Sequence, residues 1–89
     1  MNTHDKCIEA IREAIEYLDT NIPDWASRID LKRFEFILES RCIAGQLGLN
    51  TYVSRGFDSP ISTDDPDFNW SYAFMDSAWR EIIKSRQRG

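Results

Sequence analysis

Two amphipathic helical patterns, one at each end of the chain, most constrain what this sequence can fold into. In the first, "DKCIEAIREAIEYLDTNI", apolar residues recur at steps of three and four while charged residues fill the other side. The apolar positions are Ile8, Ile11, Ile15, Leu18 and Ile22. The pattern predicts a helix over residues 4–20, with Thr3 or Asp5 as its cap, which ends before Pro23 because proline cannot continue it.

The second pattern, "NWSYAFMDSAWREIIKSRQR", predicts a helix over about residues 69–86. Its apolar face consists of Tyr72, Met75, Trp79 and Ile82, with Ile83 beside them. Asn69 or Ser71 is a suitable N-cap, and the basic residues of the last turn complement the negative end of the helix dipole.

Between these helices, the stretch "NIPDWASRIDLKRFEF" follows no single period. Pro23 and Asp24 indicate a turn, and Asp24 is a suitable cap for a short helical turn that carries the next tryptophan. The apolar spacing over residues 29–36 fits two short strand pieces with a bulge, or a helix that starts at Asp30. We favour an extended or irregular segment there, followed by a helix that begins near residues 37–40.

The next stretch, "SRCIAGQLGLN", predicts a short helix on which Ile43, Gln46 and Leu47 share a face, and which Gly48 ends in the left-handed conformation. Gly45 within this helix indicates the close approach of a bulky neighbour, such as a tryptophan ring. Gln46 has two interpretations: an amide that ties down a neighbouring loop backbone, or a contact to a ligand.

Two connecting stretches complete the chain. "LNTYVSRGFD" indicates a further short element closed by Gly56, and the Pro, Asp and Ser residues of "DSPISTDDPDFN" indicate a loop. Counting from Asp58, Asp64 or Asp65 places no glycine at the sixth position, which a calcium-binding loop requires. A solvated loop is therefore expected.

Together these patterns predict a mainly α single small globular domain over residues 1–89. Two terminal amphipathic helices should pack on a middle of short helices and irregular or short extended segments. The expected core consists of Ile8, Ile11, Ile15, Leu18, Ile29, Leu31, Phe34, Phe36, Ile43, Leu47, Phe57, Met75, Trp79 and Ile82.

The sequence predicts a cytoplasmic protein. No apolar run is long enough to cross a membrane, and the N-terminal residues carry charge throughout, unlike a signal peptide. In a reducing compartment Cys7 and Cys42 are expected to be two small buried thiols. A zinc site lacks ligands, because the sequence holds no CxxC pair and His4 is its only histidine.

Catalytic chemistry finds little support. A cysteine nucleophile and a serine triad each require a histidine base, which only His4 at the chain terminus could supply. "AGQLG" lacks the Lys-Ser/Thr pair of a phosphate-binding loop. We therefore expect a non-enzymatic protein without catalytic residues, cofactor or bound metal.

The charge distribution argues against nucleic acid as a partner. The net charge is −4, and an acidic domain is a poor match for the phosphate backbone. Only the last ten residues are basic, with four basic residues against Glu81, and the helix dipole accounts for them. No contact with a membrane is expected either.

Several stretches, taken in order, carry a resemblance to a known group of proteins. They are "PDWASRIDLKRFEF", "RCIAGQL", "RGFD" and a terminal "AW" helix with basic residues. This order resembles small uncharacterised proteins of actinobacterial phages and prophages that share a C-[VI]-x-G-Q-L motif. The resemblance covers about residues 23–86, with Cys42, Gly45, Gln46, Leu47, Gly56, Phe57 and Trp79 on motif positions. The connection "GLNTYVSRGF" is shorter than in that group, and the resemblance implies a phage or prophage setting without an activity.

Two functional hypotheses follow. The first is a small phage-type protein that binds a host protein as a modulator or inhibitor, through exposed aromatic residues and the acidic loop 58–67. The alternative is a homo-oligomer that binds or sequesters a small molecule, such as a nucleotide signal, through amide, guanidinium and aromatic groups. The candidate binding residues are Gln46, Arg41, Arg55, Trp25, Tyr52 and Trp70.

Overall fold

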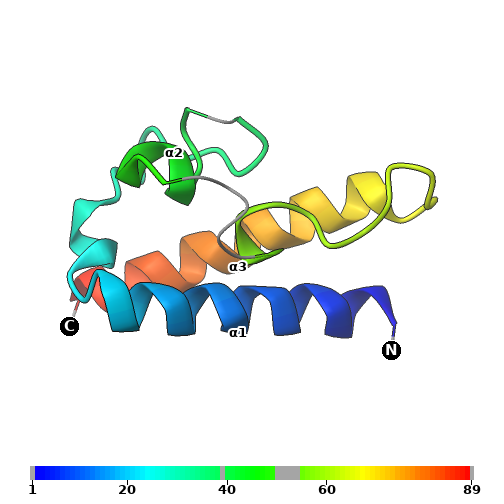
Figure 1. Ribbon diagram of the computed structural model, residues 1–89. Coiled ribbons are helices and arrows are strands. Elements are labelled where there is room, and N and C mark those ends of the chain that lie inside the picture. The colour runs from blue at the N-terminus through cyan, green and yellow to red at the C-terminus, as the bar shows by residue number, and fades with distance from the viewer. Residues whose placement is uncertain (1, 39, 50–54, 89) are drawn as a thin grey trace.

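Two long helices and a connecting segment with three short helices make up the fold. The computed structural model describes residues 2–38, 40–49 and 55–88 (Figure 1). The long helices are α1 (Thr3–Asn21) and α3 (Phe68–Arg88). Between them lie the 3-10 helix η1 (Trp25–Arg28), the helix α2 (Ile43–Leu47) and the 3-10 turn η3 (Arg55–Phe57). The described residues are mainly helical and contain no strand, as the sequence predicts.

Helix α1 follows the predicted periodicity, but its buried face is shifted toward small residues. The side chains buried along it are Cys7, Ala10, Ile11, Ala14 and Leu18. Ile8, expected in the core, is 36% exposed, because the alanine face is the one that the connecting segment covers. The N-cap is Asn2, whose side-chain oxygen accepts from the Asp5 N–H at 2.8 Å, and not Thr3 or Asp5.

Helix α3 begins at Phe68, one residue earlier than expected, so Asn69 and Ser71 lie within the helix and not at its cap. It runs in the same direction as α1, with the first residues of both helices at one end of the molecule (Figure 1). At that end the Thr3 hydroxyl donates to Asp67 at 3.0 Å. At the other end Arg86 donates to both carboxylate oxygens of Asp19, at 2.6 and 3.0 Å.

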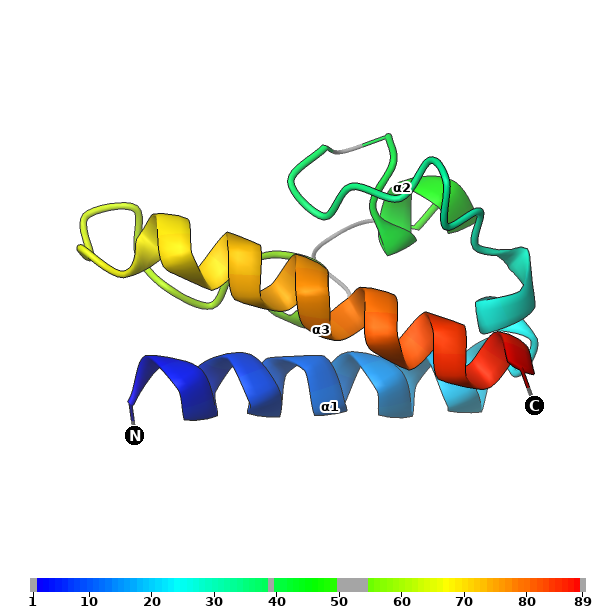
Figure 2. The same cartoon turned by 180° about the vertical axis from the view of Figure 1, so that it is seen from behind.

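The connecting segment returns along the helix pair and is irregular, as predicted for residues 29–36 (Figure 2). The helix expected to begin near residues 37–40 begins later, at Ile43, because the described residues before it form successive turns closed by backbone hydrogen bonds. Helix α2 ends at Gly48, which has a φ of 72° in the left-handed region and thus confirms the predicted stop. Asp24 precedes η1 as expected, but its side chain pairs with Arg28 at 3.0 Å instead of capping the turn.

The core lies between the helix pair and the connecting segment. Nine of the expected core residues are buried, and they are Ile11, Leu18, Ile29, Phe34, Phe36, Ile43, Phe57, Met75 and Trp79. Four more, Ile15, Leu31, Leu47 and Ile82, are only partly buried. In the last turns of α3 the fully buried residue is Ile83, and Ile82 lies at the edge.

Gly56 in η3 is the point of closest approach between the connecting segment and α1. A Cβ atom at this position would overlap the carbonyl oxygen of Ala10 and lie 2.5 Å from the Cβ of Ala14. The indole N–H of Trp79 donates to the Gly56 carbonyl at 3.1 Å in the buried interior. Because Gly56 has no side chain, the backbone of η3 can pack directly against the alanines of α1.

We predict that Gly56→Ala lowers the free energy of unfolding by about 3 kcal/mol, because a rigid backbone atom stands where the methyl group must go. Gly48→Ala is the matched control: it has a positive φ but no atom within 4 Å of an added Cβ, so its cost should be about 1 kcal/mol. Urea denaturation of the two variants measures the difference. Equal losses would contradict the close packing of η3 on α1.

Candidate functional site

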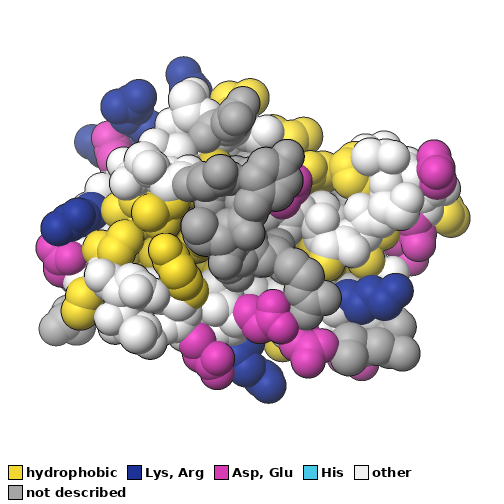
Figure 3. Space-filling view, viewed as in Figure 1, with side chains coloured by type: hydrophobic (Ala, Val, Ile, Leu, Met, Phe, Trp, Pro, Cys, Tyr) yellow, Lys and Arg dark blue, Asp and Glu magenta, His cyan; other side chains and the backbone are white. Residues whose placement is uncertain are grey.

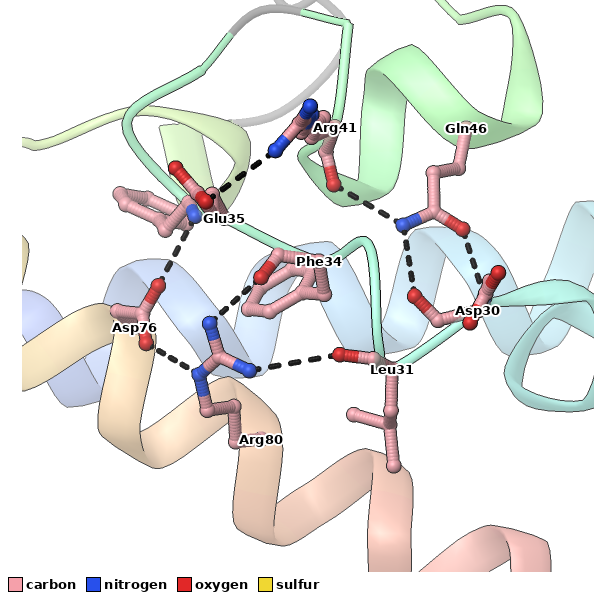
Figure 4. A network of polar contacts seen from close by, with 9 residues as sticks. Asp30, Leu31, Phe34, Glu35, Arg41, Gln46, Asp76 and Arg80 are labelled. Atoms are coloured by element: carbon pink, nitrogen blue, oxygen red, sulfur yellow. Dashed lines mark hydrogen bonds and ion pairs between the residues drawn. The ribbon is translucent and has the colours of Figure 1, made fainter.

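The side-chain amide of Gln46 links two separate parts of the connecting segment through hydrogen bonds to their backbone (Figure 4). Its Oε1 accepts from the Asp30 N–H at 2.7 Å, and its Nε2 donates to the carbonyl oxygens of Asp30 at 3.1 Å and of Arg41 at 3.0 Å. Both amide hydrogens are therefore used within the chain. Of the two interpretations of Gln46, this geometry favours the amide that ties down a loop backbone.

A second polar node, absent from the sequence-based candidates, is the Asp76–Arg80 pair on α3 (Figure 4). The Arg80 guanidinium donates to Asp76 at 2.6 Å and to the carbonyl oxygens of Leu31 and Phe34, and it lies over the Phe34 ring at 5.2 Å. Asp76 also accepts from the Phe36 N–H at 3.0 Å. Asp and Arg four residues apart on the helix were the only sequence signal for this pair.

Trp25 belongs to the core and not to an exposed binding surface. Its ring is fully buried and lies edge-on to Trp79, with ring centroids 5.9 Å apart. Its indole N–H donates to Asp19 at 2.9 Å, and the Arg86 guanidinium lies over the ring at 5.4 Å. The hydrogen bond from Arg86, and then that from Trp25, lowers the pKa of Asp19 below its ordinary value.

The remaining polar candidates lie apart or outside the described residues. Arg41 is exposed and pairs with Glu35 at 3.3 Å. Tyr52 lies outside the described residues, and the side chain of Arg55 is likewise not described. Among the candidates whose side chains are described, the structure brings Gln46 to the backbone of Arg41, and it forms no ligand pocket from them.

Trp70 is an aromatic candidate that the structure leaves accessible. It is 47% exposed on the first turn of α3 and stacks on Phe74, with centroids 5.3 Å apart and planes at 15°. Phe74 in turn lies 4.9 Å from the ring of His4 on α1. An open hollow of about 620 Å³ adjoins this aromatic group, lined by Asn2, Thr3, His4, Lys6, Asp67 and Trp70.

The acidic loop 58–67 is held by contacts to both long helices and by contacts within the loop. Asp58 accepts from the Tyr72 hydroxyl at 2.8 Å, and Asp65 accepts from the Asp67 N–H at 2.9 Å. Burial, and then the hydrogen bond to Asp58, raises the pKa of Tyr72 to about 12. In the part of the chain that the structure describes, no cluster of three metal-binding side chains occurs.

The surroundings of the two cysteines indicate a structural role. Both side chains are buried, and within the described residues they form no disulfide. The Cys42 sulfur accepts from the Gly45 N–H at 3.4 Å and so serves as the N-cap of α2. Burial raises the pKa of Cys7, which disfavours the reactive thiolate.

A second accessible feature is an apolar groove between α1 and α3. Its volume is about 260 Å³, and it is lined by Ile8, Ile11, Arg12, Ile15, Glu16, Ala78 and Ile82. The sequence analysis placed Ile8, Ile15 and Ile82 in the core, because periodicity identifies an apolar face without showing whether anything covers it.

Known proteins provide no relative from which the role of the site could be inferred. A comparison with protein families, with curated proteins and with solved structures finds no match to this chain. Among the described helices, none is long and apolar enough to span a membrane.

We predict that Gln46→Ala lowers the free energy of unfolding by about 1 kcal/mol, because three backbone groups lose their partner while water replaces part of the loss. Gln46→Glu should cost at least as much, since it removes both donors and sets a carboxylate against two carbonyl oxygens. Urea denaturation tests both variants. Unchanged stability would show that the amide is free for another role.

We predict that Asp19→Asn destabilises the protein at pH 7 by about 1 kcal/mol, a value limited by solvent screening because the side chain is 41% exposed. The folded-state pKa of Asp19 is lowered, so its contribution is present above the unfolded value of about 4 and disappears as pH falls through the lower folded value.

The difference between wild type and Asp19→Asn should therefore shrink below about pH 4, as measured by denaturation across pH. Asp24→Asn is the control, because the Asp24–Arg28 pair is more exposed, and it should cost no more than about 0.5 kcal/mol at any pH. A difference that persists undiminished at about pH 2 would contradict the role of the Asp19 charge.

Proposed function

We propose that this chain is a small non-enzymatic protein that acts by binding another protein, as a modulator or inhibitor. In the phage or prophage setting that the sequence resemblance implies, the partner is a host protein met in the host cytoplasm. The observation that carries the proposal is the exposed aromatic group of Trp70, Phe74 and His4 at the start of α1 and α3.

The chemistry of this group is that of a protein-binding surface. Tryptophan is among the residues that contribute most binding energy at interfaces, especially where an aromatic ring enters a partner's pocket. Trp70 is held flat against Phe74, so little side-chain freedom is lost on binding. The open, shallow hollow beside it suits a protein surface better than an enclosed small ligand.

The small-molecule alternative has less support from the described residues. The amide hydrogens of Gln46 are bound to backbone carbonyls, Arg41 is paired with Glu35, and Trp25 is buried. Gln46 and Arg41, two of the groups proposed to hold a nucleotide, are thus committed elsewhere, while the burial of Trp25 removes one aromatic candidate of the protein-binding surface. A protein partner therefore remains the function we propose.

The test is affinity capture from an actinobacterial host lysate, with mass spectrometry of proteins and small molecules together. Wild type should retain a discrete protein partner, and Trp70→Ala should weaken its binding about 30-fold, the equivalent of ~2 kcal/mol for a hot-spot residue. Ile37→Ala is the matched control, because Ile37 is 65% exposed on the connecting segment, and it should leave binding unchanged.

Circular dichroism and thermal unfolding should show that both variants remain folded, since both side chains are exposed. Capture of a nucleotide without a protein would support the sequestering alternative. A partner that binds Trp70→Ala as well as wild type would remove the aromatic group from the interface.

A further inference from the structure

The aromatic group and the apolar groove form one continuous strip, which we call the α1/α3 seam. On α3 it consists of Trp70, Phe74, Ala78 and Ile82, and on α1 of His4, Ile8 and Ile15. The α3 residues recur every four positions, so they follow one side of the helix. The strip from Trp70 to Ile82 is about 18 Å long at 1.5 Å per residue.

The seam lies on the side of the helix pair that the connecting segment leaves open. In Figure 2 α1 and α3 lie side by side toward the viewer, and the connecting segment is behind or above them; Figure 3 shows the opposite face. Ile8 is 36% and Trp70 47% exposed, while Ile15, Phe74, Ala78 and Ile82 are partly buried. A long, narrow apolar strip between two helices has the shape that accepts a third helix.

The charges along the seam determine which helix fits. Its α1 side carries Asp5, Glu9 and Glu16 beside Arg12, and Lys6 lines the hollow next to Trp70; all five side chains are exposed. Within the part of the chain that the structure describes, Glu9 and Glu16 form no ion pair. The α1 border of the apolar strip therefore carries more acidic than basic side chains.

From this combination we infer that the α1/α3 seam binds a basic amphipathic helix, with an apolar stripe against the isoleucines and lysine or arginine side chains beside the α1 carboxylates. A second copy of this chain fits less well, because its seam would bring the same acidic border against this one. The inference deepens the proposed function and rests on it, since it names the chemistry of the protein partner.

The direct test uses three synthetic peptides of 18 residues and the intact protein. The first carries a leucine stripe flanked by lysines, the second has glutamate in place of every lysine, and the third has the first composition with its leucines scattered. Fluorescence anisotropy of the labelled peptides measures binding at low salt. The lysine peptide should bind at least tenfold more tightly than either of the others, and added salt should weaken it.

Variants locate the binding to the seam. Ile8→Lys should weaken binding of the lysine peptide at least tenfold, because it removes an apolar contact and adds a like charge. Ile37→Lys makes the same change at an exposed isoleucine on the connecting segment, and it should change binding less than twofold. Glu9→Lys combined with Glu16→Lys should weaken the lysine peptide and strengthen the glutamate peptide.

Other outcomes overturn the inference. Equal binding of all three peptides, or full binding by Ile8→Lys, would exclude a basic helix in the seam. A dimer in sedimentation experiments that Ile8→Lys dissociates would show a second copy as the occupant. If the peptides fail while a captured partner still depends on Trp70, only the partner chemistry is wrong; if that dependence is also absent, the proposed function fails with it.

Discussion

The parallel direction of α1 and α3 is the constraint on which the rest of the structure depends. It is held at one end by Thr3 and Asp67 and at the other by the two hydrogen bonds between Arg86 and Asp19. Because the helices are parallel, the chain must return over about 28 Å, the length of α1, before α3 can begin. That return covers one side of the helix pair, and the apolar residues of the other side remain accessible.

The connecting segment has few regular backbone hydrogen bonds of its own, so side chains supply hydrogen-bond partners for its backbone N–H and carbonyl groups. Gln46 serves Asp30 and Arg41, Arg80 serves Leu31 and Phe34, and Gln87 donates to the carbonyl oxygens of Ala26 and Ile29. The stretch from Cys42 to Gly48 follows the same logic, since Cys42 caps α2 and Gly48 ends it. Cys42 and Gln46, which lie on positions of the sequence resemblance, thus stabilise the fold, and a role in binding is not needed to explain them.

Local patterns predicted what depends on local physics. The periodicity of Ile11 and Leu18 gave α1, and the glycine at position 48 gave the end of α2. The direction of α3 relative to α1 has no local signal, and it decides whether Ile8 and Ile82 are covered. Trp25 was expected on the surface because its partners, Asp19, Trp79 and Arg86, are distant in sequence. Of the proposed site, Trp70 was predictable as an aromatic beside an acidic loop, whereas the seam needed the helix pair.

Folding and recognition use different sides of the same two helices. The side with Ala10, Ala14, Asp76 and Arg80 holds the connecting segment through close packing and buried or half-buried hydrogen bonds. Substitutions there must lower stability, because each removes a contact that no solvent molecule fully replaces. Side chains of the seam are already partly exposed to water. Polar replacements at Ile8 or Trp70 should therefore lower the free energy of unfolding only slightly. A chain of 89 residues has little core to spare, and the proposed binding of a helix accounts for the apolar strip that the described residues leave uncovered.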